Sequence, residues 1–332
     1  MHSPIQKGQC SVSDYHPCAQ TVSEVQDLDG LRHVADDYKV WLLDQFGVLH
    51  DGRKAYPGTV DAVRQLAERG AQLLIISNSS KRASVTISKL GPLGFDPAWF
   101  VGAITSGELT HKYLKERTDP FFASLGHKCV HFTWSARQAV STHGLGLTVV
   151  QHPEDADFIL AHGSEAIGVA GPRAGGENDL DPPATPAPLS VMEDVMKRAV
   201  QKAIPMIVAN PDEVTVDGRD LAIMPGTLGK MYERMGGHVQ WMGKPDPVIY
   251  QAAGDMLGAD LRSVVAVGDS LHHDIGGAAA AGVDSIFVAG GIHAADLGVD
   301  AFGGKPEPSR LVALIREKDA RTPKFCLPLF NW

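Results

Sequence analysis

The chain has 332 residues, enough for one large domain or two medium ones, each with its own core. Apolar residues make up 44% and charged residues 21%, as in an ordinary globular protein, which excludes disordered and fibrous classes. The 39 acidic residues outnumber 30 basic ones that form no cluster, and the formal charge of −9 argues against a nucleic-acid partner.

The chain carries no signal for a membrane or an oxidising compartment. No apolar run approaches the roughly 18 residues needed to cross a bilayer, and no basic segment followed by an apolar one opens the chain. The four cysteines are scattered without a C-x-x-C pair, which argues against a zinc site and a disulfide framework. We therefore expect a soluble cytoplasmic protein with no membrane partner.

Short apolar runs that end in polar turns recur along the chain and predict the strands of a parallel sheet. In chain order, these runs cover residues 40–44, 71–80, 205–212, 263–270 and 284–291. Amphipathic segments lie between them, and residues 59–70 and 246–258 are the clearest predicted helices. The pattern predicts an α/β fold with a Rossmann-like, doubly wound parallel sheet, whose polar turns meet beyond the carboxyl ends of the strands.

A second set of helix and strand candidates interrupts the first and predicts an inserted α/β domain. Within it, residues 171–188 are rich in proline and glycine and predict a long flexible loop. The end of the chain is apolar enough to dock on the body of the protein or on a partner. The predicted parts are an N-terminal extension (1–30), a core domain (31–104 and 205–320), the inserted domain (105–204) and a C-terminal tail (321–332).

The first two polar turns carry groups that phosphoryl transfer needs. Asp44 ends the first predicted strand before a turn through Gly47, and a carboxylate there can attack phosphorus and hold a divalent cation. Ser77 and Asn78 follow the second run, where a hydroxyl and backbone N–H groups form a cradle for phosphate oxygens. Each feature alone is also what an ordinary strand end or helix cap would contain.

Two later turns supply a cation and two more acids. Lys244, in the stretch GKPDP, can neutralise the charge of an attacking carboxylate and of a phosphoryl group. Asp269 and Asp274, in VGDSLHHDIGG, lie between a strand and a helix of small residues. Carboxylate oxygens beside a phosphate are the usual ligands of Mg²⁺, so this last turn is the most specific of the four.

With these four turns in this order, the sequence resembles the haloacid dehalogenase (HAD) superfamily over about residues 35–305. Within it, the stretches ANPDEVTVDG and PGTLGKMYERMGG are typical of class IIA phosphatases such as the bacterial nucleotide phosphatase and the phosphoglycolate and pyridoxal-phosphate phosphatases. The resemblance implies a HAD core with an inserted C2-type cap that closes over the substrate. It also implies Mg²⁺-dependent hydrolysis of a small phosphorylated metabolite through an aspartyl-phosphate, and a homodimer.

The resemblance also implies roles for individual residues. Asp44 would be the nucleophile, Ser77 and Asn78 would bind the phosphoryl group, and Lys244 would hold the charges together.

The implied metal site uses two acids and one backbone group. Asp44, the backbone carbonyl of Phe46 and Asp269 would bind Mg²⁺. Asp274 would position the lysine or a metal-bound water. Asn210 and Asp212 belong to a turn that lies beside the site in this family.

The sequence departs from the family at position 46. There the family's phosphatases carry a second aspartate that protonates the leaving oxygen and later activates water, whereas this chain has Phe46. Loss of such a group costs roughly 10²- to 10⁴-fold in rate. Another group can supply the proton, with His50 best placed and His272 and His273 as further candidates. Otherwise the leaving group is acidic enough to need no proton, as in an acyl phosphate.

Two further alternatives follow from the same departure. In the first, the protein is a phosphometabolite-binding or scaffold protein with little or no turnover. Alternatively it has dehalogenase or phosphonatase chemistry, since dehalogenases of the superfamily carry an aromatic residue at this place and phosphonatases a small one. Asp269, Asp274 and the class IIA cap argue against the dehalogenase, and no Schiff-base lysine is identified for a phosphonatase. The phosphatase is the leading hypothesis.

Overall fold

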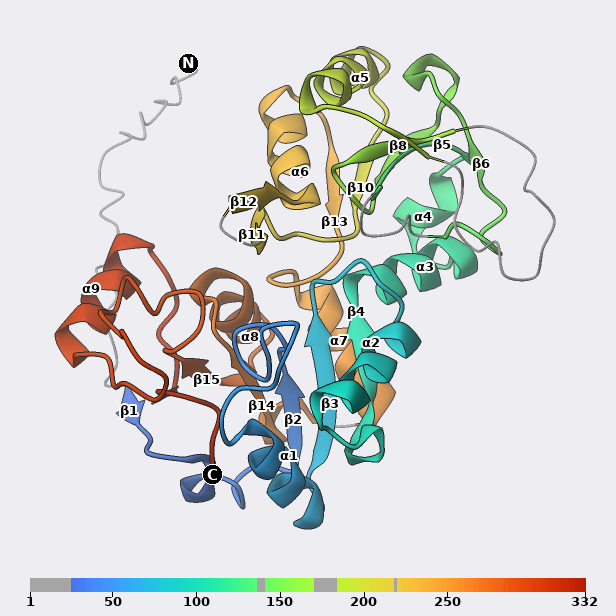
Figure 1. The fold of residues 1–332 in the computed structure, drawn as a ribbon. Helices are drawn as coiled ribbons and strands as arrows, with labels where there is room; N and C mark the ends of the chain where they lie inside the picture. The colour runs from blue at the N-terminus through green and yellow to red at the C-terminus, as the bar shows by residue number, and fades with distance from the viewer. Residues whose placement is uncertain (1–24, 136–140, 170–183, 218–219, 259) are drawn as a thin grey trace, which may run out of the picture.

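A computed structural model describes residues 25–135, 141–169, 184–217, 220–258 and 260–332. Most of the predicted loop 171–188 and most of the N-terminal extension lie outside these residues. The described chain folds into two α/β domains, each built around its own sheet, and the two lie one above the other in Figure 1. Among the described residues, no helix is both long enough and apolar enough to span a bilayer.

The core sheet is parallel throughout. Its strand order is β1-β16-β15-β14-β2-β3-β4. The strands are β1 (Gln26–Asp27), β2 (Val40–Leu43), β3 (Gln72–Ser77), β4 (Phe100–Thr105), β14 (Val264–Gly268), β15 (Asp284–Val288) and β16 (Phe325–Leu327). The apolar tail thus docks on the body of the protein, because β16 lies inside this sheet between β1 and β15.

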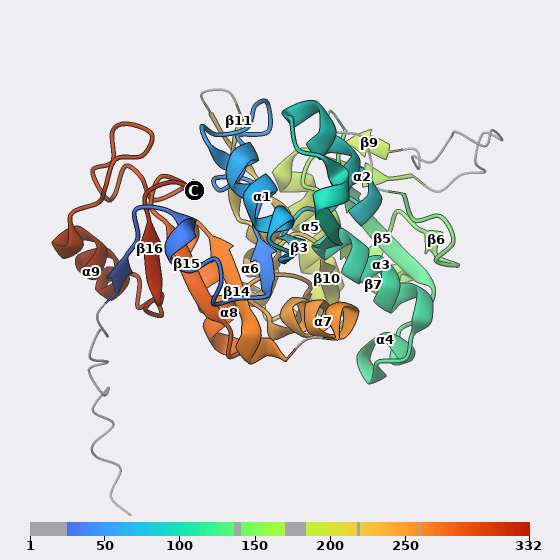
Figure 2. The same ribbon diagram turned by 90° about the horizontal axis from the view of Figure 1, so that it is seen from below.

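Helices cover both faces of the core sheet, as Figure 2 shows. Side chains alternate along a strand, so Trp41 and Leu43 of β2 pack with α1 and α2, while Leu42 packs with α7 and α8 on the other face. The helices are α1 (Thr59–Glu68), α2 (Ala83–Leu90), α7 (Pro247–Leu257), α8 (Gly276–Ala280) and α9 (Pro308–Glu317). This is the doubly wound arrangement predicted from the sequence.

The second sheet, with its helices, forms the cap domain, residues 106–241. Its order is β13-β10-β7-β5-β8-β9, with β6 beside β5. The strands are β5 (Lys128–Thr133), β6 (Thr148–Val149), β7 (Phe158–Ala161), β8 (Ala166–Gly168), β9 (Ala184–Pro186), β10 (Met206–Val208) and β13 (Val239–Trp241). The helices are α3 (Ser106–Glu116), α4 (Pro120–Ser124), α5 (Leu189–Gln201) and α6 (Pro225–Arg234), and a hairpin of β11 (Val214–Asp217) and β12 (Asp220–Ile223) follows β10.

The sequence prediction for residues 205–212 is wrong in one respect. The run does contain a buried strand, β10, but β10 pairs with β7 and β13 in the cap sheet and not with the core. The inserted domain therefore continues past residue 204 to the end of β13. A short apolar run that is buried on both faces has the same sequence pattern in the core sheet and in the cap sheet. Only the strand pairing distinguishes the two locations.

Candidate active site

The site lies where three neighbouring core strands end. Asp44 follows β2 directly and Asp269 follows β14, while Ser77 is the last residue of β3. Because β2 lies between β14 and β3, these ends are adjacent in the sheet. The backbone N–H of Asp44 continues the pairing by donating to the carbonyl of Val267 at 3.0 Å. Parallel strands thus bring together side chains that are more than 200 residues apart, at the edge where such sheets bind ligands.

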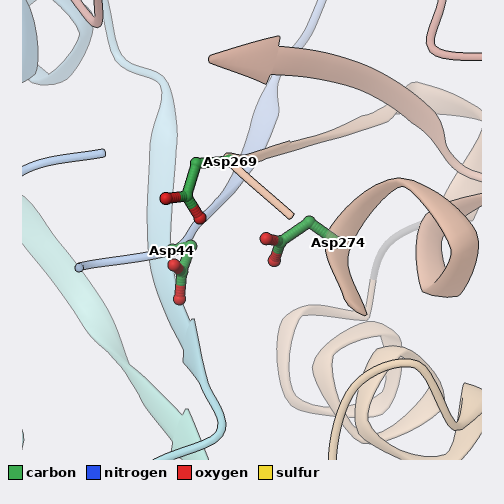
Figure 3. A group of neighbouring side chains, drawn as sticks. All are labelled: Asp44, Asp269 and Asp274. Carbon is green, nitrogen blue, oxygen red and sulfur yellow. The ribbon is translucent and has the colours of Figure 1, made fainter. Parts of the chain in front are cut away.

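Three carboxylates converge at this edge. Ligand oxygens of Asp44, Asp269 and Asp274 lie within 4.8 Å of one another, and Figure 3 shows the three side chains pointing into one space. Asp269 and Asp274 are buried, and the side chain of Asp44 is 13% exposed. Within the described residues, no other group of three acidic, histidine or cysteine side chains has this spacing.

Lys244 places one positively charged ammonium group among the three acids. Its Nζ donates to Oδ1 of Asp44 at 2.7 Å and to Oδ1 of Asp274 at 2.7 Å, with the carbonyl of Ile76 at 3.3 Å. The side chain is 3% exposed. The lysine is thus held on three sides. One ammonium group cannot balance three carboxylates, so the cluster carries an excess of negative charge when all are ionised.

Burial and mutual repulsion raise the pKa of two of these acids, Asp44 and Asp269. Burial raises the pKa of Asp44 to about 7, against the lowering effect of Lys244, and repulsion by Asp274 adds to the rise. Burial, followed by repulsion from Asp44 and Asp274, also raises the pKa of Asp269 well above its usual value. For Lys244, burial lowers the pKa, but Asp274 and Asp44 outweigh it and hold the ammonium charged. A divalent cation would relieve this imbalance.

Glycines let the backbone approach Asp269 closely. Its Oδ2 accepts a hydrogen bond from the N–H of Ile292 at 2.7 Å. A Cβ atom on Gly47 would lie 1.8 Å from that oxygen, and one on Gly291 would lie 2.2 Å from it. Gly47 also has a φ of +79°, which side chains rarely adopt. The turn after Asp44 therefore requires glycine both for its conformation and for the space that Asp269 occupies.

Asn78 connects the core to the cap. Its Oδ1 accepts from the N–H of Lys244 at 2.8 Å, and its Nδ2 donates to the carbonyl of Lys244 at 3.1 Å and to Oδ1 of Asp212 at 2.9 Å. Asp212 follows the cap strand β10, where Oδ1 of Asn210 accepts its N–H at 3.0 Å. Asn78 thus anchors the segment that carries the lysine and ties it to the Asn-Pro-Asp turn.

A second contact between the domains was not predicted from the sequence. Nε1–H of Trp134, just after cap strand β5, donates to Oγ of Ser80 at 3.1 Å. Ser80 belongs to the polar turn after β3, in which Ser77 Oγ accepts the N–H of Ser79 at 3.3 Å. The carboxyl ends of two cap strands, β5 and β10, therefore meet the same core turn. The sequence marked that turn as polar but contained no signal for its partner.

Phe46 and His50 lie together in the turn that follows Asp44. The Phe46 side chain is exposed, and its ring packs edge-to-face on the His50 ring at 4.9 Å between centroids. His50 is buried, and its Nδ1 accepts the N–H of Gly52 at 3.1 Å. Burial lowers the pKa of His50 to about 4. At neutral pH this histidine is uncharged, with one ring nitrogen engaged by backbone, so it is poorly suited to replace the missing acid.

The other two candidate histidines lie on the short helical segment Leu271–Ile275, which also carries Asp274. Nδ1 of His273 is 3.5 Å from Oδ1 of Asp212, so this ring faces the Asn-Pro-Asp turn. The His272 ring lies against the His273 ring at an interplanar angle of 59°, with ring centroids 4.9 Å apart. Burial, with His273 as the second cause, lowers the pKa of His272. Neither ring is among the groups hydrogen-bonded to Asp44 or Lys244 in the described structure.

Comparison with known proteins gives matches along most of the chain. A family model described as haloacid dehalogenase-like hydrolase matches residues 41–148, and one described as HAD-hydrolase-like matches residues 241–317. An acid sugar phosphatase from Staphylococcus haemolyticus is 28% identical over 77% of this chain and 87% of its own length. A 5′-nucleotidase, YutF, from Bacillus subtilis is 25% identical over 77% and 88%.

Solved structures share the fold. A haloacid dehalogenase-like hydrolase from Brucella suis 1330 superposes with a TM-score of 0.64 at 22% identity, covering 90% of this chain and 97% of that one. A glycerol phosphate phosphatase from Mycobacterium tuberculosis, solved in complex with calcium, superposes with a TM-score of 0.55 at 22% identity, covering 83% and 76%. The match includes both the core and the cap domain.

Proposed function

We propose that this chain, which belongs to the class IIA branch of the haloacid dehalogenase superfamily, is a phosphomonoesterase that hydrolyses a small phosphorylated metabolite. The observation that carries the proposal is the contact of Asp44 with a fully buried lysine inside a cluster of three acids. The relatives named as acid sugar phosphatase and 5′-nucleotidase support the reaction class.

The acid cluster fits a hard divalent cation. Its ligands are carboxylate oxygens, the type that Mg²⁺ prefers. Burial and mutual repulsion raise the pKa of Asp44 and Asp269, and a cation beside them would favour their ionised forms. Asp44, Asp269 and the backbone carbonyl of Phe46 would hold the ion. Asp274 has a supporting role, since its Oδ1 accepts from Lys244 and its Oδ2 accepts the N–H of Ser270. When bound, Mg²⁺ would neutralise the charge of the acids and of the incoming phosphate.

Four residues of the chain take part in the first chemical step. Oδ1 of Asp44 is engaged by Lys244, which leaves Oδ2 to attack phosphorus. An Asp44–phosphorus bond forms while the bond from phosphorus to the leaving oxygen breaks, and its electron pair leaves with that oxygen. The Lys244 ammonium stabilises the charge on the transferred group, which Ser77 and Asn78 hold at the end of β3. Closure of the cap excludes water during this transfer.

The second step returns the enzyme to its starting state. Water attacks the phosphorus of the aspartyl-phosphate, and the bond to Asp44 breaks with its electron pair returning to the carboxylate. The protons of the attacking water leave on the released dihydrogen phosphate, so this step balances without a side-chain base. With Phe46 in place of a carboxylate, we expect the step to be slow relative to that of an enzyme with the second acid.

The position of Phe46 also favours a second candidate function. Neither Phe46 nor the neutral His50 can donate a proton at neutral pH, so a protein that binds phosphorylated ligands with little turnover is the alternative. The two functions make opposite predictions for Phe46→Asp. The substitution raises turnover if the acid is the missing part, and leaves it unchanged if the protein only binds.

The experiment is phosphate release from a panel of phosphorylated compounds that includes sugar phosphates, nucleotides, acyl phosphates and aryl phosphates. Each is assayed with and without Mg²⁺, on the wild-type chain and on Asp44→Asn. The phosphatase predicts Mg²⁺-dependent release that Asp44→Asn abolishes. No release from any compound, by a protein that still binds Mg²⁺, supports the binding function instead.

A further inference from the structure

We propose that the exposed side chains of Phe46 and Ile292 bind the leaving group, and that the preferred substrate is the phosphate ester of an acidic aromatic hydroxyl. The inference rests on the proposed phosphatase function and assigns its substrate class. The two side chains are called the apolar rim below.

The two residues of the apolar rim adjoin backbone that packs on Asp269 of the acid cluster. Phe46 is 57% exposed and Ile292 is 65% exposed, among the most exposed large apolar side chains of the described structure. Each adjoins a glycine that packs on Asp269, namely Gly47 and Gly291. Isolated exposed apolar residues are common on protein surfaces, but these two flank the same buried carboxylate. A ligand whose phosphate reaches that carboxylate would bring its neighbouring atoms onto the rim.

The Phe46 ring is held in place before any ligand arrives. One side packs edge-to-face on His50, and a Cβ atom on Gly52 would lie 2.9 Å from Cε1 of the ring. Gly52, at a φ of +89°, therefore lets the backbone pass close behind the ring. A fixed aromatic ring with an open face is a preorganised partner for another ring, and such pairs gain affinity beyond simple area burial.

The chemistry of the first step points to the same ligand class. When Asp44 attacks phosphorus, the electron pair of the breaking bond stays on the leaving oxygen. An alkoxide, about as basic as the conjugate base of water (pKa of about 15.7), needs a proton at that moment. A phenol has a pKa of about 10, so its oxygen can depart as the phenolate with no proton donor. Position 46 offers no such donor, so the substrate needs an acidic leaving oxygen. An aromatic ring in the substrate acidifies that oxygen, and the same ring contacts Phe46.

The test compares esters that differ in acidity at similar size. Phenyl phosphate and 4-nitrophenyl phosphate have aromatic leaving groups, and cyclohexyl phosphate has an alkyl one. With Mg²⁺ present, the wild-type kcat/KM for phenyl phosphate should exceed that for cyclohexyl phosphate by roughly 100-fold or more, the cost of a missing acid. Phe46→Ala should lower kcat/KM for both aryl esters by roughly 2- to 10-fold, the size of a lost ring contact.

Two controls separate a ring contact from general damage. Inhibition by inorganic phosphate, which has no leaving group, should be unchanged in Phe46→Ala. Met256→Ala removes another exposed apolar side chain, which packs on Gly102 of β4, and should change neither measurement. Phe46→Leu should keep part of the aryl activity, since it keeps an apolar surface and loses only the ring.

The outcomes distinguish this inference from the function on which it rests. Equal hydrolysis of phenyl and cyclohexyl phosphate overturns the substrate class and leaves the phosphatase standing. Unchanged aryl activity in Phe46→Ala, or an equal loss for every ester and for phosphate inhibition, overturns the ring contact. No release from any ester by the wild-type chain overturns the phosphatase and the inference together.

Discussion

Removal of the buried ammonium group of Lys244 should strongly destabilise the metal-free protein. Lys244→Met keeps most of the side-chain volume but leaves Asp44 and Asp274 without the ammonium that now lies 2.7 Å from each. At an effective dielectric of about 20, one ion pair at such a distance is worth roughly 6 kcal/mol, and several kcal/mol of this is offset by the lost hydration of the lysine. Breaking a buried ion pair costs about 3–5 kcal/mol, and we expect that loss at about pH 8.

The loss should shrink at lower pH. An acid whose folded pKa is raised holds its proton more tightly in the folded state, so its destabilising effect is absent below the unfolded value of 3.8 and complete above the folded value. For Asp44 the folded pKa is about 7 with the lysine present, and removal of the lysine raises it further. At about pH 5.5 the Asp44 carboxyl is therefore mostly protonated, and Lys244→Met should cost less than at about pH 8.

The assay is urea unfolding followed by tryptophan fluorescence, with a chelator present, at both pH values. Lys230→Met is the matched control, because its lysine pairs with Glu213 at the surface and should cost less than about 1 kcal/mol. Adding Asp274→Asn to Lys244→Met should recover part of the stability by removing one unpaired charge. A loss for Lys244→Met no larger than that of the control, or one that grows at low pH, would refute the reasoning.

Three further predictions concern the metal site and the contact between the domains. Mg²⁺ affinity, measured by calorimetry, should fall by roughly tenfold from about pH 8 to about pH 6, because protons compete for Asp44 with its pKa of about 7; equal affinities would contradict this. Gly236→Ala should cost about 1 kcal/mol in thermal unfolding because of its positive φ alone, whereas Gly47→Ala should cost more and should also abolish Mg²⁺ binding, because its Cβ displaces Asp269; equal losses or retained binding would contradict this. Trp134→Phe should cost about 1 kcal/mol in urea unfolding, the net value of its hydrogen bond to the turn after β3, and unchanged stability would count against that contact.

The sequence predicted the parts of the fold that depend on local pattern. Strands β2, β3 and β14 are short apolar runs, and each ends in the polar turn that carries Asp44, Ser77 or Asp269. Because such turns gather beyond the carboxyl ends of parallel strands, their meeting followed from the fold class. The ion pairs of Lys244 with two of the acids agree with the charge-neutralising role that the GKPDP turn indicated for this lysine.

The prediction failed where the answer depends on tertiary partners. Strand β10 was assigned to the wrong sheet, since its three apolar residues do not reveal which strands they pair with. His50 was the preferred substitute acid because it lies close to Asp44 in sequence. Its burial and its bond to the N–H of Gly52 argue against that role, and both depend on how the turn after Asp44 folds back.

Other contacts of the site left no trace in the sequence. The bond from Trp134 to Ser80 joins residues 54 positions apart, and the bond from the N–H of Ile292 to Asp269 uses a backbone group that any residue could supply. The same holds for the hydroxyl of Tyr250, which donates to the carbonyl of Asp274 at 3.1 Å. Such contacts follow from the relative placement of elements, which a single sequence does not contain.

The most direct test of the proposed mechanism is to trap the phosphoryl group on the nucleophile. The chain is mixed with a ³²P-labelled substrate and Mg²⁺, quenched in acid within one turnover, and digested for peptide mapping. We predict a label on the peptide that contains Asp44, labile to hydroxylamine as an acyl phosphate is, and absent from Asp44→Asn. Full phosphate release by the wild-type chain with no label on that peptide would contradict an aspartyl-phosphate at Asp44.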